Sequence, residues 1–181
     1  MVSTPKFMAF VLGFLLLASL LLFDQDGYIS VIDDANLLFH EAGHLIFGFL
    51  GTTMGLYGGT LGQLVIPIIC GIAFWRQKSL VKVSVVMLWF FENVFNIAGY
   101  VADARAQELP LVGCGEHDWT NILTHWGALQ HDTTIATILL AVVWVGLFST
   151  LLWTAYLWWQ SKRIYAGYSF WGSAGLNILE P

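Results

Sequence analysis

The chain has 181 residues, of which 57% are hydrophobic and only 10% are charged, and its mean hydropathy is +0.72. This composition excludes a soluble globular domain and indicates an integral membrane protein. The formal net charge of -5, without any run of lysine or arginine, excludes nucleic acid as a partner and leaves the lipid bilayer as the expected surroundings.

The apolar runs predict an all-α fold, a polytopic membrane helix bundle that forms one domain over residues 1–181. The first run is followed by "DQDG" without a small-residue cleavage site before it, so we expect a retained helix and not a removed signal peptide. Five spans are expected, at about 7–23, 31–50, 61–75, 81–103 and 134–158, with a polar loop at about 104–133.

The second expected span contains "NLLFHEAGHLIFGFLG", which places ionisable side chains in an apolar helix. Each such side chain at mid-membrane depth costs roughly 2.5–3.5 kcal/mol, so three of them require a compensating partner. His40 and His44 are four residues apart and project from one helical face, where both imidazoles can bind one metal ion. In the H-E-x-x-H pattern the histidines bind zinc and the glutamate, here Glu41, is the general base. The alternative is that the histidines bond to neighbouring groups without a metal.

The next stretch, "GTTMGLYGGTLGQ", is rich in glycine and predicts a turn or a re-entrant loop. After the third span, "RQKSLVK" supplies basic residues that are expected in the cytoplasm. With five spans, this orientation predicts that the N-terminus lies outside together with Lys6 and Arg105. A re-entrant segment would change this parity.

A polar stripe follows on the fourth expected span, where Glu92, Asn96, Tyr100 and Asp103 recur at spacings of four, four and three. Such a stripe inside a span must face protein, water or metal. It offers Asp103 as a third metal ligand, with Glu92 as a further candidate. For Glu92 and Asn96 the alternative is a ladder of hydrogen bonds between helices.

The polar loop contains "GCGEHDW", where His117 lies next to Asp118 in a segment loosened by glycine. His117 is the other candidate for the third ligand, because this loop can fold back over the histidine pair. The alternative is an ordinary loop histidine, which is what we expect of His125 and His131.

The "HEAGH" helix, the glycine-rich turn and the later aspartate near a helix end together resemble the site-2-protease-like membrane metalloproteases. The resemblance implies a zinc site within the bilayer plane, with His40 and His44 as ligands, Glu41 as general base and Asp103 as the counterpart of the family's aspartate. The sequence around that aspartate, "YVADARAQELPLVG", departs from the Asn-Pro-Asp-Gly or Leu-Asp-Gly type of motif in the family. The string "ADARAQELPLVG" followed by "EHDW" also resembles small bacterial membrane proteins with an HEAGH helix.

Two functions are consistent with these residues. The first is a zinc-dependent intramembrane metalloprotease that cleaves membrane-bound protein substrates, in the inner membrane of a bacterium. The second is a non-catalytic metal-binding or structural subunit of a larger membrane complex. Glu41 favours the enzyme, because a structural metal site has no use for an unligated carboxylate beside its histidines.

Overall fold

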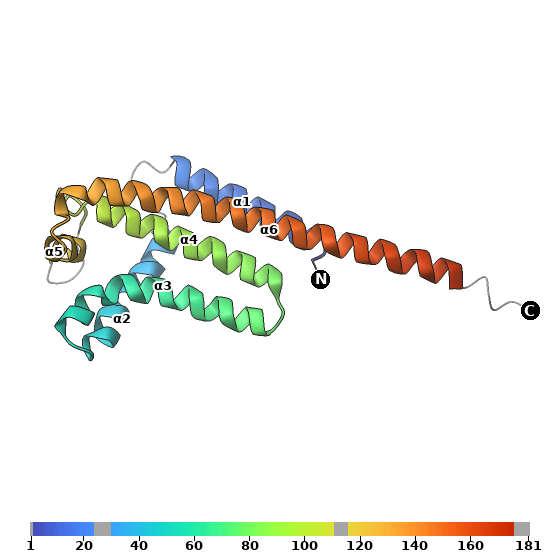
Figure 1. Ribbon diagram of the computed structural model, residues 1–181, viewed down its shortest axis with the longest axis horizontal. Helices are drawn as coiled ribbons and strands as arrows, with labels where there is room; N and C mark the ends of the chain where they lie inside the picture. Colours follow the sequence, from blue (N-terminus) through green and yellow to red (C-terminus); the bar gives the residue numbers. More distant parts are fainter. Residues whose placement is uncertain (1, 24–29, 111–115, 176–181) are drawn as a thin grey trace, which may run out of the picture.

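The computed structural model describes residues 2–23, 30–110 and 116–175 of the chain, and every regular element within these ranges is helical. The expected helical membrane bundle is confirmed. The elements are α1 (Thr4–Phe23), α2 (Ser30–Gly48), α3 (Thr52–Arg76), α4 (Leu80–Ala102), α5 (Asp118–His125), the 3-10 turn η1 (Leu129–His131) and α6 (Asp132–Gly175). Figure 1 shows α1, α4 and α6 running along one another, with α3 next to α4 and α2 folded back on α3.

Four stretches of the described chain are long and apolar enough to cross a membrane, namely α1, α3, α4 and the segment Leu129–Ile164. The expected count was five, and the difference lies in α2. This helix has only 19 residues and carries two aspartates, two histidines and a glutamate, so it is too polar to face lipid on all sides. It therefore packs as the shorter arm of a hairpin with α3.

The glycine-rich stretch is helical from Thr52 onward, which corrects the expected turn or re-entrant loop. Only Gly51 makes the turn, with a φ of 113° that favours glycine. The other glycines let α2 and α3 approach closely. A Cβ atom on Gly43 would overlap the carbonyl of Gly58, and a Cβ atom on Gly62 would overlap the carbonyl of Phe39. Small residues four apart allow this kind of packing between membrane helices.

Basic residues gather at one end of the bundle. The start of α1 meets the middle of α6, because the Val2 N–H donates to Ser161 Oγ at 2.9 Å and the Phe7 ring stacks on Trp158. The loop between α3 and α4 lies at the same end, where Trp75 stacks on Trp153. Six of the seven lysines and arginines belong to this end: Lys6, Arg76, Lys78, Lys82, Lys162 and Arg163.

This arrangement corrects the predicted placement of Lys6 with Arg105. Arg105 alone lies at the opposite end, where it donates to Asp132 at the start of α6. The cause is α2, which folds back as a hairpin arm and thereby changes the parity of the spans.

An apolar cluster at the Arg105 end attaches the short helix α5 to the bundle. Trp119, Ile122 and Leu123 of α5 pack against Ile97 and Val101 of α4. Ile122 and Leu123 are fully buried, so they dock one face of α5 firmly. The first residue of α5 is consequently held at a fixed place beside α2 and α3.

Candidate metal centre

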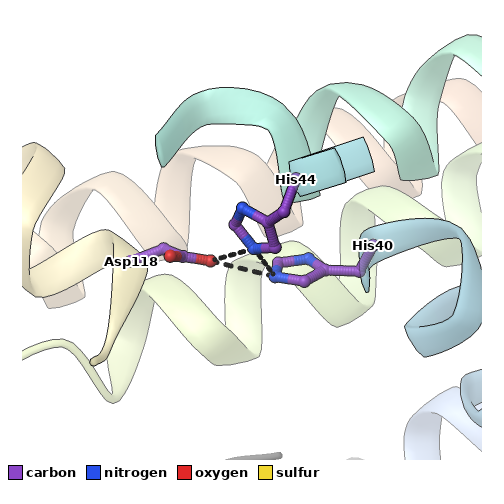
Figure 2. A group of neighbouring side chains, drawn as sticks. All are labelled: His40, His44 and Asp118. Carbon is purple, nitrogen blue, oxygen red and sulfur yellow. Dashed lines mark hydrogen bonds and ion pairs between the residues drawn. The ribbon is translucent and has the colours of Figure 1, made fainter. Parts of the chain in front are cut away.

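Three side chains meet between α2 and α5, as Figure 2 shows. The Oδ2 atom of Asp118 lies 2.9 Å from Nε2 of His40 and 3.0 Å from Nε2 of His44. The two Nε2 atoms are 3.1 Å apart. Among the described residues these three form the one group of histidine, cysteine and acidic side chains that is close enough to hold a metal ion.

The triangle of ligand atoms suits a zinc ion. A tetrahedral zinc with nitrogen and oxygen ligands at about 2.0–2.1 Å separates neighbouring ligand atoms by roughly 3.3 Å. The observed separations of 2.9, 3.0 and 3.1 Å are within a few tenths of an ångström of that value. Two imidazoles and one carboxylate also match the donor sets of catalytic zinc sites, which leave a fourth position open.

Both histidines have their second ring nitrogen bonded to an oxygen of α3. His44 Nδ1 lies 2.7 Å from the carbonyl oxygen of Gly55, and His40 Nδ1 lies 3.1 Å from Oε1 of Gln63. Because a carbonyl oxygen only accepts, each Nδ1 carries the hydrogen and each Nε2 keeps its lone pair for a metal. This is the outer-shell arrangement usual for histidine ligands.

Glycine makes room for the His40 ring. A Cβ atom on Gly59 would overlap that ring, so the side of α3 that faces α2 must be bare at this position. His40 is 6% exposed and is enclosed by α2, α3 and Tyr100, whose ring is 5.9 Å from its own. The glycine-rich sequence thus shapes the centre as well as the helix pair.

The start of α5 aims Asp118 at the histidines. His117 is the N-cap of this helix, and its Nδ1 accepts the Thr120 N–H at 3.3 Å. The Asp118 N–H donates to the hydroxyl of Tyr100 at 3.2 Å. The cap, the tyrosine and the apolar face of α5 together fix the backbone of Asp118, so its carboxylate is positioned before any ion binds.

The structure brings Asp118 to the histidine pair, and places the two expected third ligands with each other. His117 Nε2 lies 3.4 Å from Asp103 Oδ2. Asp103 also accepts the backbone N–H groups of Glu108 and Leu109, so it holds the loop that follows α4. Burial lowers the pKa of the His117 imidazole, which is therefore neutral at pH 7. Both residues support the position of α5.

Glu41, the expected general base, is half-buried on α2 directly after His40. It does not belong to the group of three, so its role as a general base stays a prediction. His125 ends α5, where it bonds to the Asn121 carbonyl, and His131 ends η1. Both are exposed and neither belongs to the group of three, but they lie on short helices and not in the expected loop.

The polar stripe of α4 faces α2 and α3 and bonds to residues of both helices. Asn96 bonds to both Gln63 and Asp33, and Glu92 accepts from Asn36. The hydrogen-bond ladder between helices is confirmed for these two residues. Tyr100, one turn further, bonds to the backbone of Asp118.

Sequence reasoning missed Asp118 and Gln63. Both lie far along the chain from His40, and the available signals were indirect. A short amphipathic segment "HDWTNILTH" begins at His117, and pairs of glycines four apart precede Gln63. No family model, curated protein or solved structure matches this chain significantly.

Proposed function

We propose that this chain is a zinc-dependent membrane metallopeptidase whose metal is held by His40, His44 and Asp118. The observation that carries the proposal is the triangle of Nε2, Nε2 and Oδ2 atoms in the centre, formed by an H-E-x-x-H helix and one distant carboxylate. Asp118 takes the ligand role that the sequence left open between Asp103 and His117.

The chain's own residues have separable roles in this proposal. His40, His44 and Asp118 would hold a zinc ion, which would supply Lewis acidity for a peptide carbonyl and for water. Glu41 accepts a proton from the attacking water and passes it to the leaving amine, as a general base and then a general acid. Outside the metal triangle, Gln63 and Gly55 hold the two imidazoles by their Nδ1–H groups.

The position of the centre favours substrates that are themselves membrane proteins. Asn96 bonds to Gln63, and Tyr100 bonds to the backbone of Asp118. Both residues belong to the last two turns of α4. The centre is therefore at one end of the spanning helices, opposite the basic end. Since short basic loops stay in the cytoplasm, we place the centre toward the outer face of a bacterial inner membrane, where it would cleave chains at or near that interface.

The second candidate function is a structural metal site within a larger membrane complex. It is favoured by the way Asp118 ties α5 to α2 across the bundle, since a bound ion would staple these helices together. Against it stand the three-ligand donor set and Glu41, because structural zinc sites are closed by four protein ligands.

Replacement of the base separates the two functions. Glu41→Gln keeps the shape of the side chain and both imidazoles, so zinc content should be unchanged while cleavage of membrane-tethered reporters falls at least about a hundredfold. Glu108→Gln, at an exposed carboxylate beyond α4, is the matched control and should cleave like the wild type. Full cleavage by Glu41→Gln would refute the hydrolytic role, and zinc binding without cleavage of any reporter by the wild type would favour the structural site.

A further inference from the structure

A line of buried hydrogen bonds leads from His40 away from the metal triangle. His40 Nδ1 lies 3.1 Å from Gln63 Oε1, and Gln63 Nε2 donates to Asn96 Oδ1 at 3.0 Å. Asn96 Nδ2 in turn donates to Asp33 Oδ1 at 3.0 Å. The line thus crosses from α2 to α3 and α4 and returns to α2, two turns before His40.

The donor and the acceptor of each hydrogen bond in the line can be assigned in one way. Asp33 ends it as a carboxylate oxygen that accepts, so Asn96 must present its amide nitrogen there and its oxygen to Gln63. Gln63 must then donate to Asn96 and turn its own oxygen to His40. At the far end this leaves His40 Nδ1 only one role, which is to donate.

A second buried carboxyl group lies one turn before Asn96 on α4. Glu92 is 1% exposed and Asp33 is 3% exposed.

The donor and acceptor roles around Glu92 can be assigned in the same way. Trp89 Nε1 only donates, and it donates to Asn36 Oδ1 at 3.0 Å. Asn36 therefore offers its amide nitrogen to Glu92 Oε2, at 2.8 Å. Each of the two buried carboxyl groups thus accepts from an asparagine, Asp33 from Asn96 and Glu92 from Asn36.

We propose that Asp33 is the acceptor that anchors this line and that, through Asn96 and Gln63, it holds His40 as the Nδ1–H tautomer with Nε2 free for the metal. Asp33, Asn96 and Gln63 are positioning residues, since none of them belongs to the metal triangle. The inference rests on the proposed metal centre, because it assigns His40 Nε2 to the ion. It also gives a role to the buried carboxyl group of Asp33, whose burial in a membrane bundle is costly.

Zinc affinity of paired variants at Gln63 tests the proposal. Gln63→Met preserves size and removes the acceptor that faces His40, so zinc affinity should fall about 10- to 100-fold. Gln63→Glu keeps an acceptor oxygen toward His40 and, when protonated, a donor toward Asn96, so affinity should stay within about threefold of wild type. A purely packing role predicts the reverse order, because methionine suits an apolar interior and a buried glutamate does not.

The anchor is tested in the same titration, run on the full detergent-solubilised chain against a chromophoric zinc chelator. Asp33→Asn should weaken zinc binding about 10- to 100-fold, whereas Asp34→Asn, at the exposed neighbouring aspartate, should have little effect. Nitrogen-15 spectra of the histidines provide a readout that does not need the metal: His40 Nδ1 should carry a hydrogen in metal-free wild type and should lose this preference in Gln63→Met.

The outcomes distinguish this inference from the metal centre itself. A wild type that binds no zinc would overturn both. A wild type that binds zinc, with Gln63→Met binding equally well and Gln63→Glu binding poorly, would overturn the inference and leave the metal centre standing. If Asp33→Asn does not fold, the Gln63 pair still decides the question.

Discussion

Asp118 Oδ2 lies 2.9 Å from His40 Nε2 although 78 residues separate them in the chain. The carboxylate comes from the first residue of a short helix, and the imidazole from the middle of another. Because α2 and α5 are far apart in the chain, their meeting depends on how α5 docks on α4. The proposed metal centre is accordingly sensitive to residues that touch neither His40 nor Asp118.

Docking of α5 is the first such dependence. Ile122→Ala removes a fully buried side chain from the face that α5 presents to α4, which costs about 2–5 kcal/mol of packing. The helix should loosen, and zinc affinity should fall at least fivefold because Asp118 moves with it. Thr124→Ala, on the exposed side of α5, is the control and should bind zinc as the wild type does. Equal affinities in a chelator competition would show that Asp118 is held by something other than this helix.

Space for the His40 ring is the second dependence. Gly59→Ala places a methyl group where the imidazole lies, so the ring must turn away and zinc affinity should fall at least tenfold. Gly99→Ala adds the same methyl group to a helix at a position with open space around it. That control should keep full affinity and gain up to about 1 kcal/mol in stability, since alanine is the better helix former. Retention of zinc by Gly59→Ala would mean that the ring does not need this face of α3.

The ends of the bundle give a prediction about membrane orientation. In a chain with Cys70 and Cys114 replaced by serine, Gln130→Cys lies at the Arg105 end and Gln77→Cys at the basic end, both at exposed positions. Because basic loops stay in the cytoplasm, an impermeant maleimide should label Gln130→Cys in spheroplasts and Gln77→Cys only after permeabilisation. Labelling of both cysteines from one side would show that the spans were miscounted, and the opposite pattern would invert the orientation.

Local features of the fold and the site were predictable from the sequence. The apolar runs predicted the bundle, and the spacing of His40 and His44 predicted that their rings meet, because a four-residue spacing on one helix needs no tertiary information. The stripe that contains Asn96 was likewise found by its helical period. These features depend only on residues within a few turns of one another.

Features set by contacts between distant segments were not predictable in the same way. The glycines of α3 suggested a turn, because glycine density disfavours isolated helices, but here it serves close approach to α2. Asp118 was passed over in favour of Asp103 and His117, since nothing local shows which acidic residue α5 will carry to the histidines. The count of five spans exceeded the four found, because α2 is held by the bundle in spite of its charges.

The proposed metal centre as a whole is tested most directly by the zinc content of the purified chain, measured for wild type and Asp118→Ala in parallel. The wild type should hold close to one zinc per chain, and Asp118→Ala should retain less than about a tenth of it after mild chelation, because two imidazoles alone bind weakly. Asp103→Asn, which alters the neighbouring carboxylate, should keep most of the metal. A wild type without zinc after zinc-replete purification, or an Asp118→Ala chain that retains its zinc while Asp103→Asn loses it, would contradict the assignment of His40, His44 and Asp118 as the metal ligands.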